Sequence, residues 1–216
     1  MDKPTVLLDI DNTILDIDSL KKQAGLIIEA NYGEGAQEDF WKIYGEVKKE
    51  LGVVDLKEIA LRFAKKRNSD DFASAIAAFL EVDFKKHLIP GAKELVDFLS
   101  KNSTLVIFSQ GHEMFQRQKI EKLGLDKRAA EVIISRSKAE LFPKIKEDFS
   151  PPFIIIDDRP EVLSVAKKAL DGVCAVWVKI GTHAEKGEVE ADFETDNLLE
   201  VISFLEGLLR WNGIKN

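Results

Sequence analysis

The sequence predicts an α/β protein with a doubly wound parallel sheet, interrupted near its start by a block of inserted helices. Short apolar runs without polar alternation recur along the chain, which is typical of strands buried on both faces. From residue 104 onward, one helical stretch separates each run from the next, the order of parallel strands joined by helical crossovers. Between residues 19 and 87 the pattern is helical throughout, which predicts the insertion.

The expected core consists of residues 1–16 and 89–216. Its strands are expected at 6–8, 104–108, 131–135, 153–157 and 173–178. Its helices are expected at 92–100, 113–123, 139–149, 161–170 and 196–209. Gly124 favours the end of the second helix, because glycine readily adopts the left-handed conformation that closes many helices. Pro143 lies early enough in the third helix to occupy its first turns.

Residues 17–88 are expected to form a small helical bundle, a segment long enough to fold as a satellite of the core. Gly33, Gly35, Gly52 and the turn at 68–71 divide this segment into helices. The apolar positions that define the helix faces are Leu20, Ala24, Ile27, Ile28, Phe40, Trp41, Tyr44, Val47, Leu51, Ile59, Phe63, Phe72, Ile76, Phe79 and Leu80. The aromatic side chains among them are interpreted as bundle core rather than as a cage for a substrate.

The composition excludes several classes of protein. Of the 216 residues, 45% are apolar and 32% are charged, which argues against disorder. The net charge of −7 disfavours nucleic acid and anionic membranes as partners. The single Cys174 excludes an internal disulfide, so a cytoplasmic location is expected. Asp9 and Asp11 interrupt the first apolar run, and no run is long enough to cross a membrane, so neither a signal peptide nor a membrane span is expected.

Polar side chains follow four of the expected strands, at the edge where parallel sheets bind ligands. They are Asp9, Asp11, Ser109, Gln110, Gly111, Ser137, Lys138, Asp157, Asp158 and Arg159. Converging carboxylates repel one another, so a cation is expected among them, and Mg²⁺ favours a few carboxylates, a carbonyl, waters and a phosphate oxygen. Ser109 and the backbone N–H groups of Gln110 and Gly111 are expected to open a helix and so to form an anion site. The pattern predicts phosphoryl transfer to a carboxylate.

Each of these motifs also has a purely structural interpretation. The aspartates of the first motif and Ser109 are residue types that commonly cap helices. The pair Asp157 and Asp158 precedes Pro160, a residue favoured at the first position of a helix. Capping and phosphate binding are compatible at Ser109, because both use the same helix terminus. Buried together, however, the aspartates would destabilise the fold without a cation.

In order along the chain, these residues resemble the four motifs of the haloacid-dehalogenase superfamily. The motifs are Asp9-Ile-Asp-Asn-Thr13, Ser109 at the end of a strand, Lys138 before a helix, and Asp157-Asp158. The segments 108–124 and 89–95 also resemble the second-motif region and the helix that follows the cap in this family. The resemblance covers the whole core. It implies a Rossmann-like catalytic core at 1–16 and 89–216 and a helical cap at 17–88.

The resemblance also implies roles for the aspartates. Asp9 would be the nucleophile that forms an aspartyl-phosphate, and Asp11 the general acid and then the base that activates water. Mg²⁺ would be held by the Asp9 side chain, the Asp11 backbone carbonyl and the acidic pair. Asp158 is favoured as the direct or water-bridged ligand with Asp157 as its partner, although the reverse order stays open.

The phosphate would be bound by Ser109, Gln110, Gly111 and Lys138. Lys144 is a competing candidate for the motif lysine, because the usual Lys-Pro dipeptide is missing here. Thr13 is expected to brace the loop. Arg159 stands in a less common form of the fourth motif. It is expected to form a salt bridge with one of the neighbouring aspartates, and the alternative is that it reaches a substrate.

The predicted function is therefore a Mg²⁺-dependent phosphatase that acts on a small phosphorylated metabolite. Asp11 favours a phosphatase, because dehalogenases that resemble this core lack a carboxylate there and need no metal. The alternative is a regulatory protein that binds a phospho-ligand on the same scaffold. A signalling receiver domain is disfavoured by the pairing of Asp9 with Asp11 and by the insertion. The chain also lacks the glycine-rich phosphate-binding loops of many nucleotide enzymes.

Overall fold

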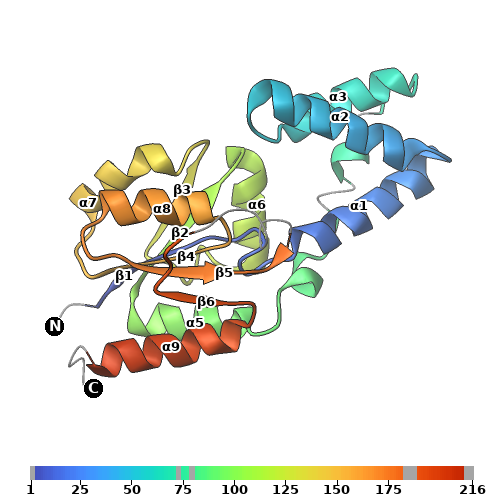
Figure 1. The fold of residues 1–216 in the computed structure, drawn as a ribbon. Helices are drawn as coiled ribbons and strands as arrows, with labels where there is room; N and C mark the ends of the chain where they lie inside the picture. The colour runs from blue at the N-terminus through green and yellow to red at the C-terminus, as the bar shows by residue number, and fades with distance from the viewer. Residues whose placement is uncertain (1–2, 72–73, 78–80, 182–188, 212–216) are drawn as a thin grey trace.

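A six-stranded parallel sheet forms the centre of the protein (Figure 1). The computed structural model describes residues 3–71, 74–77, 81–181 and 189–211. The strand order is β3-β2-β1-β4-β5-β6. The strands are β1 (Thr5–Leu8), β2 (Thr104–Gln110), β3 (Glu131–Ser135), β4 (Phe153–Asp157), β5 (Cys174–Val178) and β6 (Phe193–Thr195). The predicted doubly wound α/β fold is confirmed.

Strand β1 lies at the point where the winding of the sheet reverses. Thr5 pairs with Thr104 of β2 on one side and with Phe153 of β4 on the other. The chain runs outward from β1 through β2 to β3, and then returns to the other side of β1 to form β4, β5 and β6. In such sheets the crevice for a ligand opens at the carboxyl ends of the strands beside this reversal. The residues that follow β1 and β4 therefore share one crevice.

Helices cover both faces of the sheet, and alternate residues of the strands point to the two layers. In β1, Val6 and Leu8 belong to the cluster that includes α5 (Ala92–Asn102) and α9 (Leu198–Trp211). Leu7 points the opposite way, into the cluster with α7 (Phe142–Asp148) and α8 (Pro160–Ala169). Figure 1 shows these two pairs of helices on opposite sides of the sheet.

The expected core elements agree with the structure except at the C-terminal edge of the sheet. All five expected strands are found, and Pro143 lies at the start of α7, as predicted. Gly124 closes α6 (Glu113–Leu123) in the left-handed conformation, with φ of 68°. The sequence analysis missed β6, because three residues of mixed polarity are too few to show a strand period.

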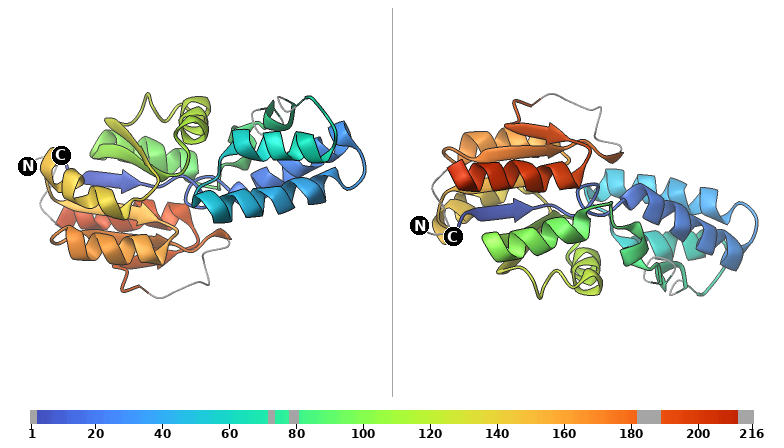
Figure 2. Two further views of the ribbon diagram at one scale, coloured as in Figure 1. Left: turned by 90° about the horizontal axis from the view of Figure 1, so that it is seen from above. Right: turned by 90° about the horizontal axis from the view of Figure 1, so that it is seen from below.

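The segment between β1 and α5 is helical, as predicted, and extends beyond the carboxyl ends of the strands (Figure 2). It contains α1 (Ile17–Tyr32), α2 (Ala36–Leu51), α3 (Leu56–Lys66) and the short 3₁₀ helix η1 (Phe84–His87). Gly33 ends α1, and Gly35 and Gly52 flank α2. The predicted apolar positions Phe72, Phe79 and Leu80 lie outside the described residues. The boundaries 17–88 for a separate domain stay a prediction.

Aromatic side chains form the centre of this helical segment. Phe63 of α3 is fully buried and meets Tyr32 and Phe40 edge to face, with ring centroids 5.0 and 5.4 Å away. Trp41 packs between Phe40 and Tyr44 in the same geometry. These contacts agree with the predicted role of the aromatic side chains as bundle core, although Tyr44 also borders a pocket described below.

Two neighbouring segments of the chain, one before α1 and one after η1, connect the helices to the core. The N–H of Ile89 donates to the Ile14 carbonyl over 3.0 Å, and the N–H of Asp16 donates to the His87 carbonyl over 2.8 Å. A single antiparallel bridge between Leu15 and Leu88 links the two connections. The two connections are therefore hydrogen-bonded to each other, and the helical segment also contacts α6 of the core, where Lys122 lies over the Phe84 ring. Among the described residues, no helix has the length and apolar character to cross a membrane.

We expect Phe63→Ala to lower the free energy of unfolding by about 3–5 kcal/mol, because it leaves a cavity among Tyr32 and Phe40. Urea denaturation followed by circular dichroism measures this change. Leu61→Ala on the same helix is the matched control, because Leu61 is 41% exposed and its truncation should cost less than about 0.5 kcal/mol. Equal losses in both variants would contradict the assigned core.

Candidate active site

Asp9 is the first residue after β1 and lies at the reversal point of the sheet. Its N–H donates to the Ile156 carbonyl of β4 over 3.0 Å, which extends the strand pairing by one residue and fixes the side chain at the sheet edge. The carboxylate is buried, and the Thr13 hydroxyl donates to Oδ2 over 3.3 Å. Thr13 thus braces the loop, as expected, and Asp9 is held rigidly with one oxygen turned toward Lys138.

Lys138 joins the ends of three strands in one buried ion-pair network. Its ammonium lies 2.5 Å from Asp9 Oδ1 and 2.6 Å from Asp157 Oδ2, and the side chain is 1% exposed. Attraction to these two carboxylates outweighs the effect of burial and raises the pKa of Lys138 above its usual value. The competing Lys144 lies on the exposed side of α7 and pairs with Asp148. The structure therefore brings Lys138, and not Lys144, to Asp9.

The acidic pair after β4 divides into two different positions. Asp157 accepts from Lys138 through Oδ2 and from the Arg159 N–H through Oδ1, over 2.6 and 2.9 Å. Asp158 borders the pocket in front of Asp9, and its carbonyl accepts from the Trp177 indole N–H over 3.0 Å. Asp157 therefore belongs to the buried ion-pair network of Lys138, whereas the Asp158 carboxylate faces the pocket.

Asp9, Asp157 and Asp158 each offer a carboxylate oxygen within 4.8 Å of the other two. Burial, with repulsion from Asp9 and Asp157, raises the pKa of Asp158 to about 9. Burial also raises the pKa of Asp9 to about 6, although Lys138 opposes the rise. A raised pKa means that the charged form of a carboxyl group is disfavoured. Both shifts therefore indicate that the positive groups of the protein do not fully neutralise the ionised carboxylates.

A count of the charges at this edge agrees with a divalent cation. Four carboxylates, at Asp9, Asp11, Asp157 and Asp158, face two buried ammonium groups, at Lys119 and Lys138. These carboxylates outnumber the two buried ammonium groups, an excess that a divalent ion would reduce, whereas Arg159, Lys21 and Lys48 bring further positive charge to the rest of the pocket lining. The donor set consists of oxygen atoms alone, which Mg²⁺ prefers. The residues present therefore fit the expected ion.

Asp11 belongs to a second ion pair that the sequence analysis did not predict. The Lys119 ammonium lies 2.6 Å from both oxygens of the Asp11 carboxylate, and Gln116 Nε2 donates to Oδ2 over 3.0 Å. The Lys119 side chain is completely buried and lies over the Phe115 ring. Enclosure in the pocket alone would raise the pKa of Asp11, but attraction and hydrogen bonding by Lys119 and Gln116 outweigh it and lower the pKa.

A left-handed residue follows the two ion-paired aspartates and leads the chain toward α1. Asn12 has φ of 59°, a conformation that asparagine adopts more readily than most residues. Its side chain accepts from the Ile17 N–H at the start of α1 over 3.3 Å. Gly181 approaches so closely that a Cβ there would lie 2.6 Å from the Asn12 side chain. This packing holds the loop that follows Asp11 in place, and Asp9 and Asp11 each meet a different lysine.

The expected phosphate-binding segment after β2 differs from the prediction. Helix α6 begins at Glu113, after His112, so Ser109, Gln110 and Gly111 do not open it. The three residues continue the strand pairing instead, and the Gly111 N–H donates to the Ser135 carbonyl over 2.9 Å. Ser109 is buried, and its hydroxyl has no hydrogen-bond partner among the described residues. Gln110 and Gly111 border the pocket.

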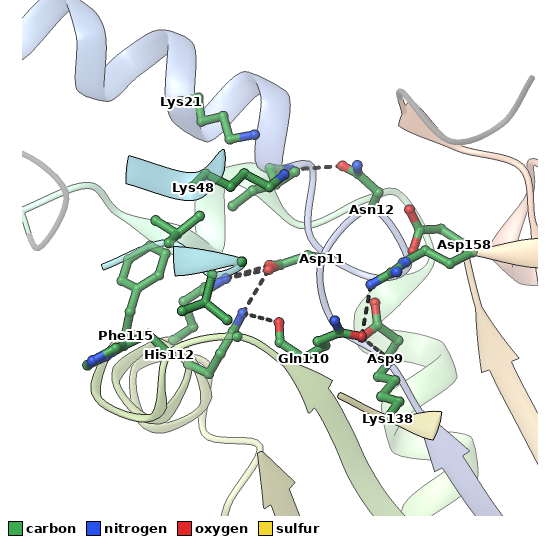
Figure 3. Close-up of a pocket in the computed structure, with 18 of the residues that line it drawn as sticks. Asp9, Asp11, Asn12, Lys21, Lys48, Gln110, His112, Phe115, Lys138 and Asp158 are labelled. Carbon is green, nitrogen blue, oxygen red and sulfur yellow. Dashed lines mark hydrogen bonds and ion pairs between the residues drawn. The ribbon is translucent and has the colours of Figure 1, made fainter. Parts of the chain in front are cut away.

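A pocket of about 210 Å³ opens between these residues and the inserted helices (Figure 3). Asp9, Asp11, Lys138 and Asp158 form its floor. The helical segment closes the opposite side with Ile17, Lys21, Tyr44, Lys48, Gly52, Val53 and Val54. Arg159 also borders the pocket, but it bonds to Glu161 and Gln110. The expected salt bridge from Arg159 to a neighbouring aspartate was therefore wrong.

Two groups of site residues escaped the sequence analysis. Gln116 and Lys119 lie three positions apart on the buried face of α6, beside Phe115 and Ile120. Polar residues at apolar positions of a helix are a signal that could have identified them. Lys21 and Lys48 come from the insertion, whose orientation relative to the core depends on tertiary packing that sequence periodicity does not report.

Comparison with known proteins supports the fold. No protein-family model and no curated protein matches the chain. Among solved structures, a haloacid dehalogenase-like hydrolase from Burkholderia xenovorans shares 24% identity over 94% of this chain and 98% of its own, with a TM-score of 0.80. The chain has the fold of haloacid dehalogenase-like hydrolases.

Two further structures show the range of this fold. The HAD-hydrolase YfnB from Bacillus subtilis, bound to magnesium, is 18% identical over 95% of this chain and 99% of its own, with a TM-score of 0.64. L-2-haloacid dehalogenase from Xanthobacter autotrophicus, with chloropropionic acid covalently bound, is 14% identical over 96% of this chain and 99% of its own, with a TM-score of 0.63. Both a magnesium-bound protein and a dehalogenase therefore share the architecture.

We expect the protein in EDTA to lose stability as the pH rises from about 7 to 9. The folded Asp158, with its pKa of about 9, keeps a proton that the unfolded side chain loses near pH 4, so unfolding releases that proton. The free energy of unfolding should fall by up to about 1.4 kcal/mol per pH unit. Denaturant unfolding at several pH values measures this slope. Excess Mg²⁺ or Asp158→Asn should flatten it, and an equal slope in Asp158→Asn would contradict the assignment.

We expect Lys119→Met to raise the pKa of the Asp11 carboxyl, because enclosure in the pocket would no longer be opposed by the ammonium. Carbon-13 NMR titration of the aspartate carboxyls measures this change. Lys144→Met is the control, because Lys144 pairs with the exposed Asp148 far from the pocket. A folded Lys119→Met protein with an unchanged Asp11 pKa would show that Lys119 does not hold this carboxylate in its charged form.

Proposed function

We propose that the protein is a Mg²⁺-dependent phosphatase that hydrolyses a small phosphate monoester through an aspartyl-phosphate at Asp9. The observation that carries the proposal is the position of Asp9: a buried carboxylate at the floor of the pocket, beside Lys138 and within metal-sharing distance of Asp157 and Asp158. The second carboxylate, at Asp11, borders the same pocket and supplies an acid–base group.

In the first step, an Asp9 carboxylate oxygen attacks phosphorus and the bond from phosphorus to the ester oxygen breaks. Asp11 gives a proton to the departing oxygen, which leaves as an alcohol. In the second step, Asp11 accepts a proton from water as the water oxygen attacks phosphorus. The bond between phosphorus and Asp9 then breaks, which releases inorganic phosphate and restores the Asp9 carboxylate and the protonated Asp11.

Asp11 needs a proton for the first step, whereas Lys119 and Gln116 hold it in the ionised form here. A dianionic phosphoryl group in the pocket would repel the Asp11 carboxylate and so favour its protonation. The same ion pair suits the second step, in which Asp11 acts as a base. Lys119 therefore sets the form that Asp11 has before substrate arrives.

Charge on the transferred phosphoryl oxygens would be balanced by groups already at the floor. Lys138 supplies a fixed positive charge beside Asp9. The Ser109 hydroxyl is buried without a partner among the described residues, and a phosphoryl oxygen would satisfy it. Mg²⁺ held by Asp9, Asp158 and the Asp11 carbonyl, with Asp157 behind them, would polarise the phosphoryl group.

Two other functions use the same fold. A dehalogenase shares the architecture. In this chain, however, the Asp11 carboxylate at the pocket and the three carboxylates that could hold a cation, at Asp9, Asp157 and Asp158, favour phosphoryl transfer. A regulatory protein that binds a phospho-ligand would also use the pocket. The complete set of a nucleophile, an acid–base group and a lysine favours catalysis over binding alone.

We expect Asp9→Asn to lower kcat for phosphate monoesters by about 10⁴-fold or more, because an amide cannot form the acyl-phosphate. Release of inorganic phosphate from a panel of small monoesters, with Mg²⁺, measures the activity. EDTA should abolish it and added Mg²⁺ should restore it. Asp148→Asn is the control, because the Asp148 carboxylate is exposed on α7, where it pairs with Lys144.

The same preparations should be tested with 2-haloacids, with halide release as the readout. Halide release without phosphate release would establish a dehalogenase instead. Full phosphatase activity in Asp9→Asn would remove Asp9 as the nucleophile. Tight phosphate-ester binding without turnover would favour the regulatory alternative.

A further inference from the structure

The side of the pocket that faces the phosphoryl site carries positive charge. Lys21 of α1 and Lys48 of α2 both line it, and Figure 3 shows the two ammonium groups on the side opposite Asp9 and Lys138. The other lining residues from the helical segment are Ile17, Tyr44, Gly52, Val53 and Val54, and none of them is acidic. Asp55, which follows them, points its carboxylate to the start of α3 and to His112.

The position of Lys21 is fixed by aromatic packing. Its ammonium lies 5.6 Å from the centre of the Tyr44 ring, which in turn packs edge to face on Trp41. The carboxylate of Asp18 is 3.8 Å away, at the outer limit of an ion pair, and both side chains are partly exposed. Such a pair contributes little. Lys21 also attracts the Asp11 carboxylate and helps to lower the pKa of Asp11, which places the charge of Lys21 on the pocket side.

Lys48 follows Tyr44 by one helical turn, so both side chains emerge on the same face of α2. The C-terminal end of α2 also reaches this wall through Gly52, and its partial negative charge of about half an elementary charge would repel an anion. Against this partial charge, Lys21 and Lys48 bring two positively charged side chains to the same wall. The phenol of Tyr44 adds a hydrogen-bond donor, because burial and repulsion from Asp11 and Asp18 raise its pKa above the usual value.

The floor already contains what a transferred phosphoryl group needs, namely Lys138, the unsatisfied Ser109 hydroxyl and the place for a cation. The lysines on the opposite wall lie beyond that group, where the leaving portion of a substrate would extend. The pocket is also small, at about 210 Å³, so the leaving portion must be short.

We propose that the leaving group of the substrate carries a second anionic group, either a carboxylate or another phosphate, and that Lys21 and Lys48 bind it. This inference rests on the proposed function for the identity of the first group. The substrate class is then a short phosphorylated acid or a short bisphosphate, rather than a phosphate ester of a neutral alcohol.

Phosphonates test this inference without turnover, because their carbon–phosphorus bond is not cleaved by the proposed reaction. The probes are 4-phosphonobutanoate, butane-1,4-bisphosphonate and the neutral-tailed 4-phosphonobutanamide, and calorimetry with Mg²⁺ gives their dissociation constants. We expect both anionic probes to bind the wild-type protein at least about tenfold more tightly than the amide, the effect of one charge-assisted contact. Comparison of the two anionic probes identifies a carboxylate or a phosphate as the better second group.

The variants Lys21→Met and Lys48→Met, alone and together, should reduce this preference, and the double variant should bring the ratio close to one. Lys22→Met and Lys49→Met are matched controls on the same helices, because both side chains are exposed and neither borders the pocket. They should keep the wild-type ratio. Equal binding of the amide and the anionic probes by the wild-type protein, or a preference that survives in the double variant, would overturn the inference.

Hydrolysis of the corresponding phosphate esters separates this inference from the proposed function. If the esters of neutral and acidic alcohols are hydrolysed equally well and the calorimetric ratio is one, the phosphatase stands and the second anion site fails. If no ester is hydrolysed but the ratio is high and depends on Lys21 and Lys48, the second anion site stands and the phosphatase fails.

Discussion

Two buried lysines allow four carboxylates to meet at one edge of the sheet. Lys138 bridges Asp9 and Asp157, and the Lys119 ammonium donates hydrogen bonds to both carboxylate oxygens of Asp11. An aspartate that lacked such a partner here would be protonated or would weaken the fold, as the raised pKa of Asp158 illustrates. The rest of the architecture serves to deliver these side chains: β1 and β4 supply the acids, and the segments after β3 and within α6 supply the ammonium groups.

The two lysines divide the site into a nucleophile half and an acid–base half. Asp9 and Asp11 are only two residues apart, yet they bond to different lysines. Each lysine favours the charged form of its carboxylate, against the effect of burial. For Asp9 burial still dominates, whereas for Asp11 the ammonium does. Two aspartates are thus placed in different electrostatic environments within one short loop. Such a difference commonly allows two residues of one type to take different catalytic roles.

The sequence could predict the sheet because its strands are buried on both faces and therefore read as plain apolar runs. It could also predict which strand ends converge, because parallel strands share one carboxyl edge, and Asp9, Lys138 and Asp158 do meet there. The helix after β2 starts at Glu113, as predicted, but the end of the strand was misplaced. The strand continues through Ser109 to Gln110, which keeps these residues away from the start of α6, and nothing in the local residues marks that extension. Lys119 stands at an apolar position of α6, but its partner Asp11 comes from a distant segment, so their ion pair follows only from the packing of α6. The partners of Arg159 and the positions of Lys21 and Lys48 at the pocket depend on contacts between distant segments, which local patterns do not contain.

The central place of β1 also has a consequence for how the chain folds. Thr5 pairs with Thr104 and with Phe153, so the strand that carries Asp9 acquires its two neighbours only from much later parts of the chain. Contacts of such long sequence separation form slowly, because the entropy of closing the intervening loops must be overcome first. The carboxylate cluster therefore assembles as a late event, after Lys138 and β4 are available to neutralise and enclose it. A partly folded chain would keep these aspartates in water, where their mutual repulsion is weak.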